Sequence, residues 1–227
     1  MKTIRNFESE QMALLNALAK KLGREPDEEW TAQSLFMQLL ESVKRDGMTE
    51  LIHYIETETD FLTAPASTRF HGNYEKGLLI HSLLVYILLS SKNKQYHLGL
   101  SDDSLIICAL MHDLCKCNFY GTEYKNKKVY KSNGSKSDAA GRFDWETVPC
   151  FVINDQFPLG HGEKSLSLVQ DFIKLSETEK MLIRWHMGPF ASKEEYGFNN
   201  ATEWEPAVCA MYTADLEASN LFELKMD

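Results

Sequence analysis

The dipeptide His112-Asp113 lies in a strongly apolar run, residues 104–116, and places an imidazole and a carboxylate side by side in that run. Burying an ionised carboxylate beside an imidazole costs several kcal/mol unless another group compensates its charge. Two other apolar runs have the same anomaly, one at His81 and the other at Asp215. A divalent cation would compensate the buried charge, because imidazole and carboxylate are both metal ligands. These residues therefore predict a buried metal site.

Two further histidines, His161 and His186, complete a set of six candidate ligands from well-separated segments. A lone histidine among apolar residues is more often a hydrogen-bonded core residue than a ligand. That interpretation would have to hold at each position independently, so metal binding explains the set more economically. Imidazole and carboxylate ligands without thiolates suit Mn, Fe, Co, Ni or Zn, whereas so many imidazoles favour Mg less.

Hydrophobic periodicity predicts a mainly α-helical chain that positions these side chains. Residues 1–60 form an N-terminal helical extension, and residues 61–227 form the domain that contains the candidate ligands. Strand-like composition flanking a Gly- and Ser-rich stretch predicts a β-hairpin inserted at about 117–160. Helices are expected over 6–24, 28–46, 48–58, 78–91, 102–116, 163–174, 177–187 and 204–222. Specificity is expected to come from the hairpin, the turn-rich stretch 61–77 and a loop at 188–200.

Composition restricts the class of protein. The 227 residues carry a net charge of −9, which argues against long nucleic acid and anionic membranes as partners. No apolar run is long enough to cross a bilayer and no signal peptide is apparent, so we expect a cytoplasmic protein. The five cysteines are expected to be free thiols. A lysine cluster at 124–136 is either a solvated hairpin face or, less favoured, a lid that meets phosphate.

The order of the candidate ligands resembles that of a known superfamily. The pattern H…HD…H…H…D, with the local sequences Gly77-Leu-Leu-Ile-His81-Ser and Leu110-Met-His-Asp-Leu-Cys-Lys116, resembles the HD-domain metal-dependent phosphohydrolases over roughly residues 70–220. It looks most like members with two additional histidines, which hold two metals. The stretch before His81 also resembles HD-type exoribonucleases and uncharacterised bacterial HD hydrolases.

This resemblance implies an HD-domain helical bundle and a role for each candidate. His81, His112, Asp113 and Asp215 would hold one divalent ion, and Asp113 would bridge to a second ion held by His161 and His186. Lys116 would face the phosphate of a small phosphorylated substrate, most naturally a nucleotide. Cys115 departs from the glycine usual at its position. The implied reaction is hydrolysis of a phosphate mono- or diester by metal-bound hydroxide, with Asp113 and Lys116 as catalytic residues.

Other interpretations stay open. The chain could be a metal-bearing module that senses a nucleotide without turnover, or a nuclease acting on short single strands. His71 could contact substrate or cap a turn. Trp145, Trp185 and Trp204 are expected to pack in the core or at its rim rather than stack on a base. The sequence leaves the oligomeric state open.

Overall fold

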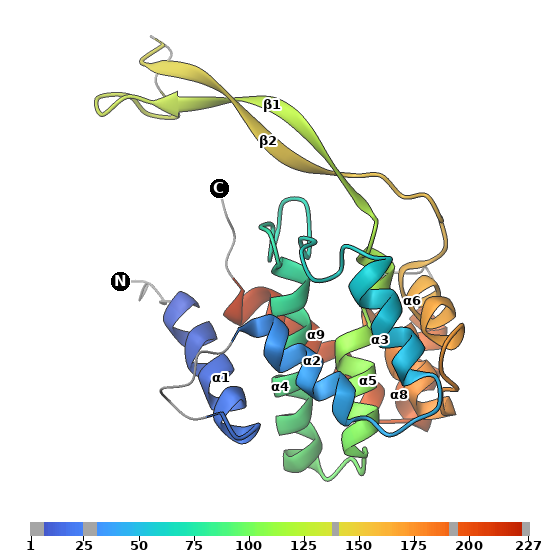
Figure 1. Cartoon of the computed structure of the whole chain (residues 1–227). Coiled ribbons are helices and arrows are strands. Elements are labelled where there is room, and N and C mark those ends of the chain that lie inside the picture. Colours follow the sequence, from blue (N-terminus) through green and yellow to red (C-terminus); the bar gives the residue numbers. More distant parts are fainter. Residues whose placement is uncertain (1–6, 25–30, 138–140, 191–194, 224–227) are drawn as a thin grey trace.

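The computed structural model describes residues 7–24, 31–137, 141–190 and 195–223. It is mainly helical with one two-stranded antiparallel sheet, which confirms the predicted mainly α architecture and its β-hairpin (Figure 1). The α-helices are α1 (Phe7–Lys21), α2 (Ala32–Ser42), α3 (Met48–Thr57), α4 (Gly77–Tyr96), α5 (Asp102–Met111), α6 (His161–Gln170), α7 (Glu177–Arg184), α8 (Glu195–Trp204) and α9 (Ala207–Glu217). The strands are β1 (Tyr120–Tyr130) and β2 (Phe143–Ile153).

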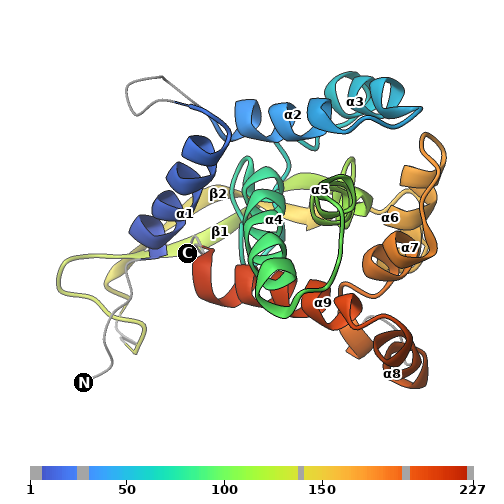
Figure 2. The ribbon, with the colours of Figure 1, turned by 90° about the horizontal axis from the view of Figure 1, so that it is seen from below.

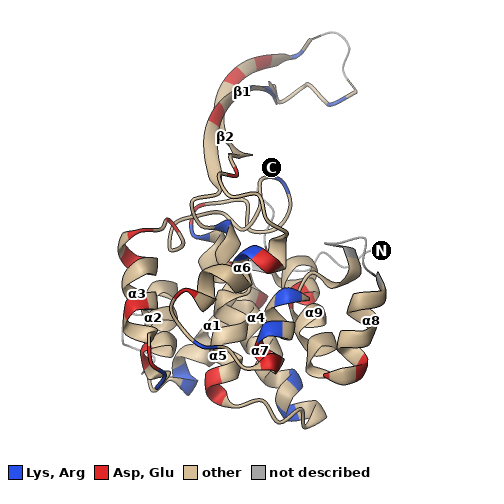
Figure 3. Cartoon of the chain, turned by 90° about the vertical axis from the view of Figure 1, so that its right-hand side faces the viewer, with Lys and Arg blue, Asp and Glu red and all other residues tan. Residues whose placement is uncertain are grey.

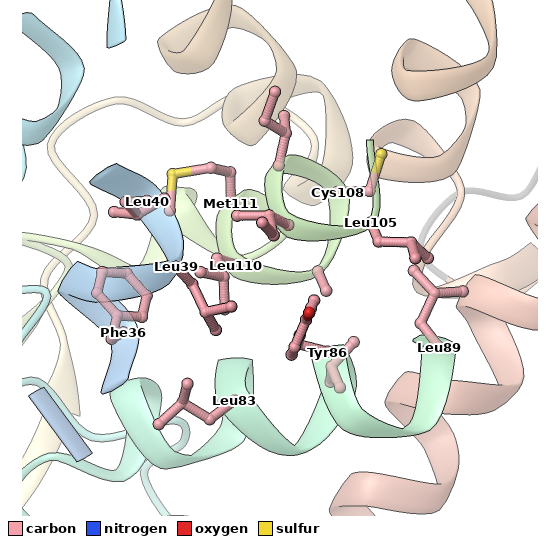
Figure 4. Close-up of a cluster of buried hydrophobic side chains, with 14 of the residues drawn as sticks. Phe36, Leu39, Leu40, Leu83, Tyr86, Leu89, Leu105, Cys108, Leu110 and Met111 are labelled. Carbon is pink, nitrogen blue, oxygen red and sulfur yellow. The ribbon is translucent and has the colours of Figure 1, made fainter. Parts of the chain in front are cut away.

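Helix α4 occupies the centre of the helical body (Figure 2). It contacts α5 and α9 most extensively and also packs against α1 and α2. Its apolar residues surround the helix rather than forming one stripe, which is the pattern of a helix buried on all sides. Figure 4 shows side chains of α4 and α5 meeting those of α2, with Leu83, Leu110 and Phe36 among them. A polar side chain that α4 directs into this core, such as His81, is therefore fully buried.

The N-terminal helices share this hydrophobic core. Leu18 of α1, Leu39 of α2 and Leu51 of α3 are buried in the same cluster as α4 and α5. Helix α2 begins at a capping box in which Thr31 and Ser34 exchange hydrogen bonds between side chain and backbone. The predicted extension is thus packed onto the helices that carry the candidate ligands.

The hairpin extends away from the helical body as a twisted two-stranded ribbon (Figure 1). Eleven residues of each strand pair in continuous register from Tyr120 opposite Ile153 to Tyr130 opposite Phe143. The strands are longer than the short apolar segments from which they were predicted. The sequence did not reveal their full length because lysines and acids on the exposed strands conceal the alternation of apolar and polar residues. Most side chains in both strands are exposed.

The structure differs from the prediction at one helix boundary and in one segment that was expected to be a loop. Helix α5 ends at Met111, and a 3₁₀ turn, Leu114–Lys116, follows instead of a helix to residue 116. Part of the expected 188–200 loop is helix α8, despite Gly and Asn residues of low helix propensity. Phe198 of α8 packs edge-on against Tyr212 of α9, with ring centroids 5.4 Å apart, so tertiary contact supports this helix. Residues 191–194 of that loop lie outside the described residues.

An ion pair between the half-buried Arg45 and the buried Glu179 connects the segment after α2 to the C-terminal half. Arg45 donates two hydrogen bonds, of 2.9 and 2.8 Å, to the carboxylate of Glu179, the capping-box residue of α7. Ser104 donates a third to that carboxylate, at 2.8 Å. Burial raises the pKa of Glu179, but these hydrogen bonds outweigh it, and the pKa is lowered from its ordinary 4.5.

We predict that Arg45→Ala destabilises the fold by about 3 kcal/mol, because it leaves the buried Glu179 carboxylate without its cation. Since the pKa of Glu179 is depressed in the folded state, the pair stabilises the protein above the unfolded pKa. That stability disappears as pH falls through the folded pKa. Urea unfolding at neutral pH and at successively lower pH measures both effects, and Arg45→Ala/Glu179→Gln should recover part of the loss. Equal stability of Arg45→Ala and wild type at neutral pH would contradict this assignment.

Candidate metal centre

The fold brings all six candidate ligands together. His81 comes from α4, His112 and Asp113 follow α5, His161 begins α6, His186 follows α7 and Asp215 lies on α9. Among the described residues, four groups of three side chains each have ligand atoms within 4.8 Å of one another, and three of those groups consist entirely of these six residues. Five of the six are buried, and His161 is partly exposed.

The Asp113 carboxylate lies between two sets of histidines. Its Oδ2 is 3.3 Å from Nε2 of His81 and 3.4 Å from Nε2 of His112. Its Oδ1 is 2.9 Å from Nε2 of His161 and 3.4 Å from Nε2 of His186. Each oxygen therefore faces its own pair of imidazoles, which is the arrangement required of a carboxylate that bridges two ions.

Asp215 belongs to the first of these sets, since its Oδ1 is 3.1 Å from Nε2 of His81. Both carboxylates are buried, and neighbouring positive groups outweigh the effect of burial on their pKa values. Burial raises the pKa of Asp113, but Lys116 and His112 hold it well below its usual range. The pKa of Asp215 is likewise lowered, chiefly by His81 against the effect of burial. Both side chains are therefore anionic at neutral pH.

The buried histidines turn the same ring nitrogen toward the carboxylates. Nδ1 of His112 donates to the carbonyl of Ala109 at 2.8 Å, and Nδ1 of His186 donates to the carbonyl of Ile183 at 2.7 Å. Because a carbonyl only accepts, each Nδ1 carries the proton and a neutral ring leaves Nε2 with a free lone pair. Hydrogen bonds of this kind fix the orientation of histidines that bind metals.

The lone pairs of two neighbouring Nε2 atoms would repel each other unless a proton or a metal ion lay between them. Nε2 of His81 and Nε2 of His112 are 3.1 Å apart, and each also faces Asp113. Nε2 of His186 is buried without a hydrogen-bond partner. One proton shared between the two nitrogens, or a shared metal ion, would relieve this repulsion, and the nitrogen and oxygen donors suit a divalent transition metal. The residues present thus fit the metals predicted from the sequence.

The raised pKa values of two histidines also show that the buried carboxylates favour positive charge at this site. Burial lowers the pKa of His81, but Glu223, Asp113 and Asp215 outweigh it and raise that pKa well above 6.5. Burial also lowers the pKa of His161, but Cys115 and Asp113 outweigh it and raise that pKa to about 9. Without a metal, these two rings therefore hold protons at neutral pH.

The short turn after Asp113 directs Lys116 back to the site. The backbone N–H of Lys116 donates to the carbonyl of Asp113 at 2.9 Å, and its Nζ lies 2.7 Å from Oδ2 of the same residue. The intervening Cys115 is buried, and its N–H donates to Oγ of Ser165 at 3.0 Å. The turn therefore accommodates the cysteine and still places Lys116 against Asp113.

A glycine allows the second pair of histidines to meet. A Cβ atom on Gly162 would lie 2.1 Å from the carbonyl oxygen of Arg184, so no other residue fits without moving the backbone. Helices α6 and α7 approach each other at this point, and the rings of His161 and His186 lie 5.5 Å apart. Arg184 also forms an ion pair with Glu163, away from the ligands.

Glu223 was not among the predicted site residues, yet it contacts one of them. Its side chain is fully buried, and Oε1 lies 2.5 Å from Nδ1 of His81. Glu223 therefore does for His81 what backbone carbonyls do for His112 and His186: it accepts from Nδ1 and orients the ring. The acceptor at His81 is an anion, whereas the carbonyls are neutral. Glu223 follows the π-helical turn Ala218–Phe222, which packs against α1.

A cavity of about 640 Å³ opens over the site. Lys116, His161 and Asp215 lie in its wall, together with His71, Tyr120 and Tyr212. Burial and the nearby His81 lower the pKa of His71 to about 4, so this ring is neutral at neutral pH. Its Nε2 is buried without a hydrogen-bond partner. His71 is therefore placed to hydrogen-bond a ligand in the cavity.

The remaining candidates lie elsewhere. All five cysteines are free thiols, as predicted. Trp185 packs between Arg184 and Phe198. Trp145 on β2 and Trp204 at the end of α8 are 62% and 64% exposed, so the expectation of core or rim packing was wrong for both.

We predict that Glu223→Ala weakens divalent-metal binding by about 10- to 100-fold, because His81 loses the acceptor that holds its ring. Glu223→Gln, which keeps an oxygen but removes the charge, should lose less. Glu217→Gln is the matched control, since Glu217 precedes the same turn and pairs with Lys92 away from the ligands. Calorimetric titration with Mn²⁺ measures the affinities. Equal affinity in Glu223→Ala and Glu217→Gln would show that Glu223 does not support His81.

Comparison with known families, curated proteins and solved structures found no match to this chain. Within the described residues, no helix has the length and apolar character needed to cross a membrane. We therefore infer the function from the geometry of the site and from the order of its residues along the chain.

Proposed function

We propose that this protein is a metal-dependent phosphohydrolase that cleaves a phosphate mono- or diester of a nucleotide at a two-ion centre. The convergence of four imidazole Nε2 atoms on the two oxygens of Asp113 is the observation that carries the proposal. Such a donor set is costly to bury without cations, and a pair of cations bridged by a carboxylate suits phosphoryl chemistry.

The HD-type resemblance supports the same reaction. It implies one ion at His81, His112, Asp113 and Asp215 and a second at Asp113, His161 and His186. The two faces of the Asp113 carboxylate divide the histidines into those same sets. The mainly helical body around α4 and α5 is compatible with an HD-domain bundle.

When bound, two divalent ions would supply an activated water molecule and neutralise charge that develops on phosphoryl oxygens. The chain's own residues position the reactants. Asp113 presents one oxygen to each set of histidines, and Lys116 sets a positive charge between Asp113 and the cavity. A substrate phosphate that attracts Lys116 would leave the Oδ2 atom of Asp113 free to serve as a ligand.

The cavity accommodates a substrate of nucleotide size. Its volume, about 640 Å³, lies within the range common for small-molecule sites. Phe119 and Tyr120 supply apolar and aromatic wall for a base, while Lys116 and His71 supply polar groups. The alternative of a nucleotide sensor without turnover predicts that the same cavity holds a nucleotide that is recovered intact.

We predict that His112→Ala and Asp113→Ala each lower phosphoesterase activity by more than about 100-fold, because each removes a ligand. The metal content should fall in parallel. His53→Ala serves as the control, since His53 is an exposed histidine of α3 remote from the cluster. Activity is measured with p-nitrophenyl phosphate, bis-p-nitrophenyl phosphate and a panel of nucleotides, and metal content by elemental analysis. Wild-type turnover and metal content in both variants would refute the proposal, and metal retained with no turnover of any ester would favour the sensor.

We further predict that metal affinity rises with pH from neutrality to about 9. His81 and His161 are protonated in the metal-free protein, with the pKa of His161 raised to about 9, so protons compete with metal ions. Calorimetry in buffers of different ionisation enthalpy should therefore detect proton release on binding Mn²⁺ at neutral pH. Binding without proton release would contradict these assignments.

A further inference from the structure

The two faces of the hairpin differ in chemistry. Residues paired across an antiparallel ladder lie on one face, and alternate pairs lie on opposite faces. One face, here named the aromatic face, carries Tyr120, Thr122, Tyr124, Asn126, Lys128 and Tyr130 of β1 with Phe143, Trp145, Thr147, Pro149, Phe151 and Ile153 of β2. The other face carries valines together with the acids Glu123, Asp144 and Glu146 and the lysines Lys125 and Lys127.

The aromatic face is exposed along much of its length. Tyr124 is 74% exposed and Trp145 62% exposed. The hairpin that carries them projects away from the helical body (Figure 3). Near the tip, the Phe143 ring lies 5.6 Å from Trp145 and 5.9 Å from Tyr130. The rings form a row held against one another, because Lys128 lies over both Phe143 and Trp145, 4.2 and 5.3 Å from their centroids.

The aromatic face begins in the cavity over the candidate metal centre. The first pair of the ladder, Tyr120 and Ile153, lies on the aromatic face and also lines the cavity beside Lys116. The Tyr120 hydroxyl donates to the carbonyl of Ala66 at 3.1 Å, which fixes the base of the hairpin to the cavity wall. At about 3.4 Å per residue, eleven-residue strands extend this surface about 35 Å outward.

The charge of the hairpin is opposite to that of the chain. Residues 120–153 contain six lysines and arginines against four acids, in a protein with a net charge of −9. Among the twelve described residues of the aromatic face, Lys128 is the sole charged side chain. An anionic ligand can therefore approach this face without meeting a carboxylate on it.

We propose that the aromatic face binds a short single strand of nucleic acid, whose bases stack on the exposed rings while one end enters the cavity. Aromatic side chains beside lysines are the surfaces that bind unpaired bases without strong sequence preference. A strand is favoured over a protein partner because the face is continuous with the cavity that would receive a phosphoester. The proposal rests on the proposed phosphohydrolase function and identifies its substrate class as an oligonucleotide.

Binding is tested separately from hydrolysis, with the full chain in EDTA and a fluorescein-labelled oligouridylate or oligothymidylate. Wild type should bind, and the intrinsic fluorescence of Trp145 should be quenched. Tyr124→Ala/Trp145→Ala should weaken binding by about tenfold or more. Lys128→Ala should reduce the salt dependence of binding by about one phosphate contact. Val129→Thr, at an exposed position on the opposite face, should bind as wild type does.

Circular dichroism verifies that each variant is folded. Failure of wild type to bind either oligonucleotide, or equal binding by Tyr124→Ala/Trp145→Ala, would overturn the inference. So would a dimer in light scattering that the same double substitution dissociates, because the face would then be a self-association surface. Oligonucleotide binding in EDTA together with inactivity toward every phosphoester would instead refute the hydrolytic function and leave this binding surface in place.

Discussion

The structure of the site depends on one buried carboxylate. Asp113 is almost fully enclosed, and its two oxygens are approached by four imidazoles and the ammonium of Lys116. Positive charge from protons and Lys116 compensates it in the metal-free chain, and the fixed Nδ1–H groups of His112 and His186 leave ligand nitrogens aimed at the same point. A pair of divalent ions would satisfy those atoms at once.

The apolar helices make this arrangement effective. Because α4 and α5 are buried on nearly every side, the charges they carry interact through a medium less polarisable than water. The N-terminal helices complete that enclosure, and α1 packs against the turn that precedes Glu223. The region predicted as an extension therefore supports the position of His81 through Glu223.

The sequence predicted which polar residues the fold brings together, because each lies in or beside a strongly patterned segment. His81, His112 and Asp215 stand out against apolar helical runs, and the fold brings these runs together. Glu223 escaped prediction because it lies beyond the last predicted helix, which ends at residue 222, and 142 positions from its partner. Helix α8 escaped because tertiary packing of Phe198 overrides weak propensity. The aromatic face became visible only from the register of the strands, which places Tyr124 and Trp145 on one side.

Anomalous diffraction from crystals grown with Mn²⁺ tests the central claim most directly, since it locates ions independently of activity. The account predicts two anomalous peaks on opposite sides of the Asp113 carboxylate, one against His81, His112 and Asp215 and the other against His161 and His186. Two metals bridged by a carboxylate commonly lie about 3.5–4 Å apart. Crystals grown in saturating Mn²⁺ that show no peak at Asp113, or a single ion that leaves His161 and His186 without a metal, would contradict it.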